Sequence, residues 1–156
     1  MPDVLIVDGY NILHCWPELV RIKESSFTHA RDKLIAELVN YQPYWGGPVI
    51  VVFDAFQVAD TVERKEKIGA VEIIYSGPGE TADTAIEKMV GNMEARGQVY
   101  VATSDYLEQR MIFGKGALRI PATELKDNIE KAHREMNRIG REDLQTNSME
   151  YYLHSD

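Results

Sequence analysis

The sequence predicts an α/β fold in which helices cover both faces of a mostly parallel sheet. Largely apolar runs rich in β-branched residues, typical of buried strands, occur at residues 4–7, 49–53, 71–75 and 99–102. Segments with apolar residues three and four positions apart, the spacing of amphipathic helices, lie between and after these runs. Strands that alternate with helices in this way form parallel sheets with right-handed crossovers.

Four segments have the helical spacing, and they cover residues 26–41, 81–96, 105–113 and 121–139. Gly97 and Gly140 follow the second and the fourth, where a glycine commonly ends a helix. Pro121 stands at the start of the fourth, in the turn where proline is favoured. We therefore expect these two helices to end at their glycines.

The length of 156 residues suits one domain with one substantial core. We predict a folded domain over residues 1–140 and a polar C-terminal tail over residues 141–156, which lacks a clear apolar period. The chain has no apolar run of membrane-spanning length, and its first residues lack a secretory signal pattern, so we expect a cytoplasmic protein with no membrane segment. The single cysteine, Cys15, excludes an internal disulfide.

Four aspartates occupy comparable positions in this predicted architecture. Asp8 and Asp54 directly follow the first two strands, Asp105 comes soon after the fourth, and Asp83 lies one turn inside a helix. Each alone has a simpler reading as a turn residue, a helix cap or a first-turn acid that suits the helix dipole. In open α/β sheets, however, the ligand crevice lies beyond the carboxyl ends of the strands. We therefore predict that the four aspartates converge there.

Converging carboxylates repel one another unless a cation neutralises them. Mg²⁺ or Mn²⁺ is the natural partner, because these ions prefer oxygen ligands, and the chemistry they support here is phosphodiester hydrolysis. Asn11, close to Asp8, is placed to orient a water molecule or a phosphate, or to cap a helix. Thr103 and Ser104 offer hydroxyl groups to the substrate beside Asp105, or to the local backbone.

The formal net charge of −8 means that any basic surface for nucleic acid must be local. Arg110, Lys115 and Arg119 cluster near a glycine-rich turn, where they are candidates for binding the substrate or are simply solvated charges. Candidates for stacking on unpaired bases are Tyr10, Trp16, Tyr106 and Phe113.

Four stretches carry a family resemblance: VLIVDGYNIL, VVFDA, GETADTAIEKM and VATSDYLEQRMIFGKGALR. Together they resemble the YacP-like branch of the NYN domains, within the PIN-like nuclease superfamily, over roughly residues 1–140. The resemblance implies a three-layer α/β/α PIN-like sandwich and an endoribonuclease that acts on mRNA in a ribosome-associated context. It also implies a metal site at Asp8, Asp54, Asp83 and Asp105, with catalytic roles for Asp8, Asp83, Asp105 and Asn11.

Two other classes of protein are alternatives. A phosphatase of the haloacid-dehalogenase type resembles this chain in its first aspartate, but would need a second aspartate where Tyr10 stands. A non-catalytic RNA- or ribosome-binding module on the same fold stays open, although a binder gains nothing from negative charge where phosphates must lie.

Overall fold

A computed structural model of the chain describes residues 2–54, 65–77, 79–93, 97–104 and 116–154. Its centre is a six-stranded sheet with the order β3-β4-β2-β1-β5-β6. The strands are β1 (Val4–Asp8), β2 (Val49–Phe53), β3 (Lys65–Ile68), β4 (Val71–Tyr75), β5 (Val99–Ala102) and β6 (Leu118–Ile120). All neighbouring strands are parallel except β3, which pairs antiparallel with β4 at one edge. The predicted mostly parallel sheet is confirmed.

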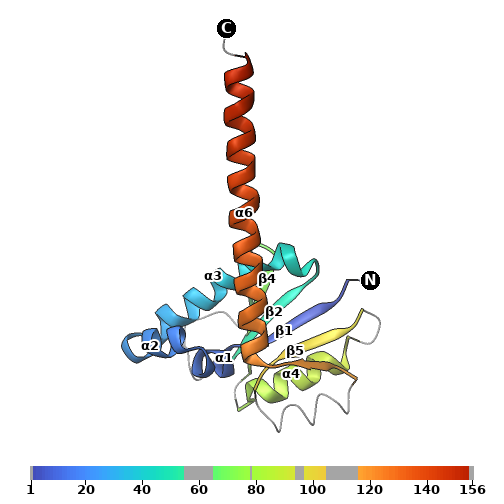
Figure 1. The fold of residues 1–156 in the computed structure, drawn as a ribbon. Helices are drawn as coiled ribbons and strands as arrows, with labels where there is room; N and C mark the ends of the chain where they lie inside the picture. Colours follow the sequence, from blue (N-terminus) through green and yellow to red (C-terminus); the bar gives the residue numbers. More distant parts are fainter. Residues whose placement is uncertain (1, 55–64, 78, 94–96, 105–115, 155–156) are drawn as a thin grey trace.

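Helices cover both faces of this sheet and complete a three-layer sandwich (Figure 1). The described helices are α1 (Gly9–Cys15), α2 (Pro17–Ser25), α3 (Phe27–Trp45), α4 (Ala82–Gly91) and α6 (Ala122–His154). One core cluster joins α1, α2, α3 and the first turns of α6 to one sheet face, and a second joins α4 to the other. The predicted α/β/α architecture is therefore confirmed.

The central strand β1 is buried along its whole length, as its unbroken apolar run predicts. Val7 stands opposite Val51 of β2 and Ala102 of β5, so the three strands end almost level. This register brings the residues that follow each strand to one edge of the sheet, which we call the carboxyl edge.

Four elements escaped the sequence-based prediction, for identifiable physical reasons. β3 is a charged, exposed edge strand without an apolar run, and β6 has only three residues. α1 has seven residues and follows β1 without a break, because Asp8 both ends the strand and caps the helix. α2 begins at Pro17, directly after Trp16, which is the C-cap of α1.

Two predicted helix ends are wrong. α4 ends at Gly91 with Asn92 as its C-cap, well before Gly97, and α6 continues through Gly140 to His154. A glycine inside a helix costs only about 1 kcal/mol relative to alanine, so it does not by itself end one. The predicted helix over residues 105–113 lies outside the described residues.

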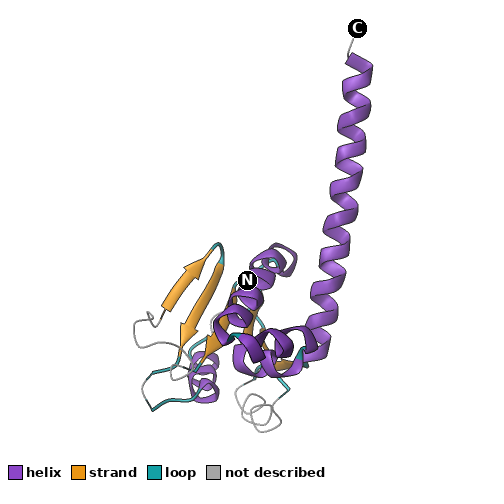
Figure 2. Cartoon of the chain, turned by 90° about the vertical axis from the view of Figure 1, so that its left-hand side faces the viewer, coloured by secondary structure: helices purple, strands orange, loops and turns teal. Residues whose placement is uncertain are grey.

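α6 has 33 residues and is therefore about 50 Å long. Its first turns pack against α1 and α3, and the rest extends beyond the body of the molecule (Figures 1 and 2). The predicted boundary at residue 140 consequently falls inside a continuous helix. In the described part of the chain, no helix combines the length and apolarity needed to cross a membrane.

The start of α1 lies very close to β2, and this contact yields a stability prediction. A Cβ at Gly9 would overlap the buried ring of Phe53, reaching within 2.6 Å of Cδ1. We expect Gly9→Ala to destabilise the fold by about 1–3 kcal/mol, because a packed core does not accommodate the extra carbon. Thermal unfolding measures the loss.

Gly140→Ala is the matched control, since a Cβ there meets no atom within 4 Å among the described residues. Alanine at this helical position should stabilise the protein by about 0.5–1 kcal/mol. A Gly9→Ala protein as stable as the wild type would contradict the close packing of α1 on Phe53.

Candidate active site at the carboxyl edge of the sheet

Polar side chains gather at the carboxyl edge. Asp8 ends β1, Asp54 follows β2, Ser76 follows β4, and Thr103 follows β5. Asp8, Ser76 and Thr103 are the buried polar residues among the described part of the chain, which otherwise buries apolar side chains. The sequence offered Ser76 only as the first residue of the Ser-Gly-Pro-Gly stretch that ends the third predicted strand, so its burial at this edge was missed.

Asp8 holds two segments together with its two carboxylate oxygens. Oδ1 accepts a hydrogen bond from the backbone N–H of Asn11 at 3.3 Å, which makes Asp8 the N-cap of α1. Oδ2 accepts from the Thr103 hydroxyl at 3.4 Å. With 5% of its surface exposed, Asp8 is fixed at the end of the central strand.

Asn11 links α1 to the end of β5. Its Oδ1 accepts a hydrogen bond from the Ser104 backbone N–H at 2.7 Å and lies 3.7 Å from the Cys15 thiol, which donates to it. The side-chain oxygen therefore fixes the chain immediately before Asp105, which itself lies outside the described residues. Asn11 is not the N-cap of α1, because Asp8 occupies that position.

Asp54 positions α4 across the edge. Its Oδ1 accepts a hydrogen bond from the backbone N–H of Ala82, the first residue of α4, at 2.6 Å. This charge-assisted bond directs the N-terminus of α4 toward the carboxyl edge. Asp83 is the next residue, in the first turn of the helix and half-buried. Asp8 and Asp54 thus lie at the ends of neighbouring strands, and Asp83 lies in the first turn of the helix that Asp54 contacts.

Among the predicted substrate-binding residues, Thr103 and Arg119 are linked. The Nε–H of Arg119, on β6, donates to the Thr103 carbonyl at 2.9 Å. Arg119 is half-buried, so it is part of the edge rather than a freely solvated charge. Arg110 and Lys115 lie outside the described residues.

The carboxylate set is chemically suited to a hard divalent cation, since Mg²⁺ and Mn²⁺ prefer oxygen ligands. Across the ranges that the structure describes, no three His, Cys, Asp or Glu side chains form a group that could hold an ion. Mg²⁺ commonly binds through one or two carboxylates and retains waters, so a site of two aspartates suffices. Asp8 and Asp83 fit that requirement by donor chemistry, and Asp105 remains a predicted ligand.

The stacking candidates Tyr106 and Phe113 lie outside the described residues, and the prediction for Trp16 is wrong. Trp16 is 3% exposed, and its ring N–H donates to the Ala122 carbonyl at 2.8 Å. It therefore belongs to the core between α1 and α6. Tyr10 is half-buried and packs edge-on against His14, with ring centroids 4.2 Å apart.

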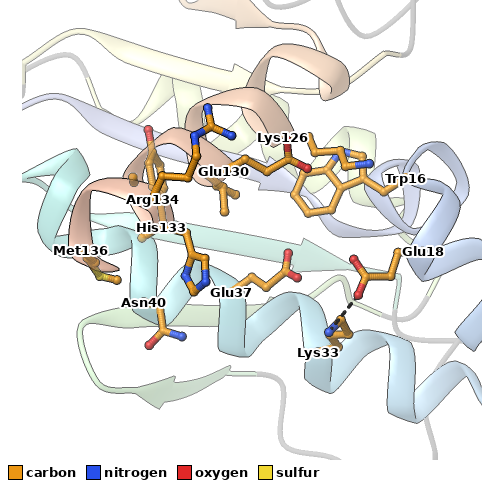
Figure 3. Close-up of a pocket in the computed structure, with 13 residues that line it drawn as sticks. Trp16, Glu18, Lys33, Glu37, Asn40, Lys126, Glu130, His133, Arg134 and Met136 are labelled. Atoms are coloured by element: carbon orange, nitrogen blue, oxygen red, sulfur yellow. Dashed lines mark ion pairs between the residues drawn. The ribbon is translucent and has the colours of Figure 1, made fainter. Parts of the chain in front are cut away.

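A separate pocket of about 430 Å³ lies between α3 and α6, and sequence reasoning did not anticipate it (Figure 3). Glu37 of α3 points into it, and Glu18 and Glu130 also line it (Figure 3). Burial raises the pKa of the Glu37 carboxyl, and the nearby negative charge of Glu18 raises it further. Glu18 itself pairs with Lys33 at 3.0 Å, and this contact raises the pKa of the Lys33 ammonium.

Comparison with known proteins identifies relatives over nearly the whole chain. Residues 5–156 match the model of the YacP-like NYN domain. The chain is 47% identical to the Bacillus subtilis (strain 168) protein YacP, described as uncharacterized, over 87% of this chain and 80% of that protein.

Solved structures agree with this match. The crystal structure of Rae1 (YacP) from Bacillus subtilis superposes with a TM-score of 0.82 at 43% identity, over 98% of this chain and 88% of that one. The structure of a single-residue mutant of Rae1 gives a TM-score of 0.78 at 43% identity, over 92% and 84%. The resemblance read from the sequence motifs is confirmed.

The bond from Ala82 to Asp54 generates a second prediction. We expect Asp54→Ala to destabilise the protein by about 1 kcal/mol, because the first N–H of α4 loses its acceptor. Asp54→Asn keeps an oxygen at the same place and should cost less. Thermal unfolding followed by circular dichroism measures both, and equal stability of Asp54→Ala and the wild type would contradict a stabilising role of the hydrogen bond from Ala82 to Asp54.

Glu37 generates a third prediction, on pH. Its raised pKa means that ionisation of the carboxyl is less favourable in the folded than in the unfolded state. Glu37→Gln should therefore unfold at a higher temperature than the wild type at pH 7. The difference should shrink as the pH falls through the raised pKa and vanish below the ordinary value of 4.5. Glu24→Gln, at an exposed position on α2, is the control and should show no such trend.

Proposed function

Because the chain belongs to the YacP-like NYN domain family, we propose that it is a metal-dependent endoribonuclease that hydrolyses phosphodiester bonds in single-stranded RNA. The family relationship supports a nuclease-like, RNA-related role. The observation that carries the proposal is the joining of Asp8, Asn11, Thr103 and Ser104 by hydrogen bonds at the carboxyl edge.

Each residue has a role that follows from its position. Asp8 and Asp83, with Asp105, would supply the carboxylates for Mg²⁺ or Mn²⁺, and Asp54 would contribute charge while fixing the start of α4. Such an ion, when bound, activates water and stabilises the leaving oxygen of the phosphodiester. Asn11 positions the backbone of Ser104 through its carbonyl oxygen. Thr103, Ser104 and Arg119 would border the path of the RNA, and Arg110 and Lys115 stay predicted contacts outside the described residues.

Rigidity at this edge supports catalysis more directly than the number of carboxylates. Asp8 is buried and bonded through both oxygens, so its negative charge is held in place before any substrate arrives. A fixed charge needs no reorganisation during the reaction. The same arrangement would be unfavourable for a module that only bound RNA, because an uncompensated carboxylate repels phosphate.

We further propose that mRNA is presented to the enzyme by the ribosome. The net charge of −8 weakens unaided attraction to RNA, since non-specific affinity comes from cationic contacts to phosphates. A docking partner removes the need for a large basic surface on this chain. The proposal predicts that translating ribosomes increase the rate of cutting.

Cleavage of a labelled single-stranded RNA tests the fourth prediction. The wild type should cut with Mg²⁺ or Mn²⁺ and not with EDTA, and faster when translating ribosomes present the RNA. Asp8→Asn and Asp83→Asn should each lower the rate at least about 100-fold, because each removes a charge from the metal site. Both variants should keep the circular dichroism spectrum of the wild type, since asparagine retains an oxygen acceptor at the Asp8 cap.

Retained cutting in both folded variants would reject the site assignment. RNA or ribosome binding with no cutting under any condition would instead favour the non-catalytic binding module. Gly140→Ala is the control for expression and purification of a variant, because it changes an exposed position on α6 that is not part of the carboxyl edge. It should cut at the rate of the wild type.

A further inference from the structure

A second hollow opens on the face of the sheet covered by α3 and α6. It has a volume of about 560 Å³ and is bordered by the end of α3, strands β5 and β6, and the start of α6. We call it the aromatic groove, after Trp45 and Tyr100, which line it together with Arg119, Glu124 and Asn128. Its volume lies within the range of small-molecule sites and accommodates a nucleoside.

The two aromatic rings are held in fixed orientations. Their centroids are 5.5 Å apart with the ring planes nearly perpendicular, at 86°. The Trp45 ring N–H donates to the Asp3 carbonyl at 2.9 Å, which prevents the ring from rotating freely. Both side chains are only half-buried, so part of each ring faces the groove. A fixed, partly exposed aromatic surface is suited to stacking on a flat ring.

The groove runs beside β5 and β6, and two of its lining residues, Arg119 and Ile120, connect it to the candidate active site through their hydrogen bonds with the Thr103 backbone. Arg119 lines the groove and also donates its Nε–H to the Thr103 carbonyl, while the Thr103 hydroxyl donates to Asp8. Tyr100 lies three residues before Thr103 on the same strand, a separation of about 10 Å along β5. Trp45 lies beside Asp3, just before the start of β1, so an RNA strand bound at the carboxyl edge would run over more than one nucleotide along the sheet before a base reaches the aromatic rings.

The charged residues that line the groove favour the base of a nucleotide over its phosphate. Asp3 and Glu124 line the groove with one cation, Arg119, so its charged side chains carry a net negative charge that disfavours a phosphate, whereas a neutral base carries no such penalty. One oxygen of Asp3 is already occupied by the Gln98 backbone N–H, at 3.1 Å. Glu124 is exposed, and carboxylates only accept hydrogen bonds, so it suits a base that presents an amino group.

We propose that the aromatic groove binds one unpaired base of the RNA, stacked on the face of one of the two perpendicular rings of Trp45 and Tyr100 and in edge-on contact with the other, with its exocyclic amino group donating to Glu124. This proposal rests on the proposed function, because it names a subsite for the same RNA. It assigns sequence recognition to a surface away from the carboxylates that would hold the metal.

Binding of RNA octamers to the full chain tests this subsite, in EDTA so that no metal-dependent cutting occurs. Among the two tryptophans, Trp16 is buried, so quenching of tryptophan fluorescence by added RNA reports on Trp45. Tyr100→Leu should bind an adenosine octamer about tenfold more weakly or worse, as expected for the loss of a stacked base. Trp45→Leu lacks the reporting tryptophan, so its binding is measured by the fluorescence anisotropy of a labelled adenosine octamer. This variant should also bind about tenfold more weakly than the wild type.

Tyr44→Leu is the matched control, because Tyr44 is 41% exposed, adjacent to Trp45, and does not line the groove. It should bind as the wild type does. An octamer with purine riboside in place of adenosine lacks only the amino group, so the wild type should bind it about tenfold more weakly. Glu124→Ala should bind both octamers alike.

Wild-type affinity for the adenosine octamer in folded Trp45→Leu and Tyr100→Leu proteins would overturn the subsite. If the same wild type cuts RNA with metal, only the subsite is rejected and the nuclease proposal stands. If the groove variants lose RNA binding but the wild type cuts nothing, the subsite stands and the nuclease proposal is rejected. No binding of RNA by the wild type would overturn the subsite as well.

Discussion

The burial of β1 on both faces is the constraint on which the site depends. A strand that is packed on each side and paired with β2 and β5 cannot shift its register without exposing its apolar residues. The position of Asp8 is therefore set by the core, and the hydrogen bonds to Asn11 and Thr103 add orientation to a location already fixed. The acidic edge is stable because the apolar strand behind it is.

The sequence was most informative where burial imposes a simple pattern. The four apolar runs were found because strands covered on both faces contain few polar residues, and their alternation with helices predicted the parallel sheet. β3 and β6 were missed because edge strands need no apolar pattern. The prediction that α6 ends at Gly140 was wrong because Gly140 sits in an exposed turn of α6. The free-energy cost of one glycine there is small compared with the stabilisation of the whole helix.

In the candidate site, too, some features could be predicted from the sequence and others could not. Aspartates at strand ends could be recognised from their position, but their hydrogen bonds could not, and Asp54 proved to accept a hydrogen bond from the first residue of a helix that begins 28 residues later. Asn11 could be placed near Asp8, whereas its bond to Ser104 depends on the pairing of β1 with β5. Trp45 and Tyr100 escaped notice because nothing in the linear sequence relates two aromatic residues so far apart.

The length of α6 has a consequence for how the C-terminal end of the chain is placed. Among the residues whose burial is described, those of α6 that belong to the core lie in its first turns, up to Ala132, so residues added or removed well beyond them leave this packing unchanged. Each such residue moves the end by about 1.5 Å and rotates its direction by about 100° around the helix axis. The distance of this end from the core and its direction around the helix axis therefore depend on the number of residues in the helix. Evolution can adjust where the C-terminus points without altering the nuclease-like domain from which it extends.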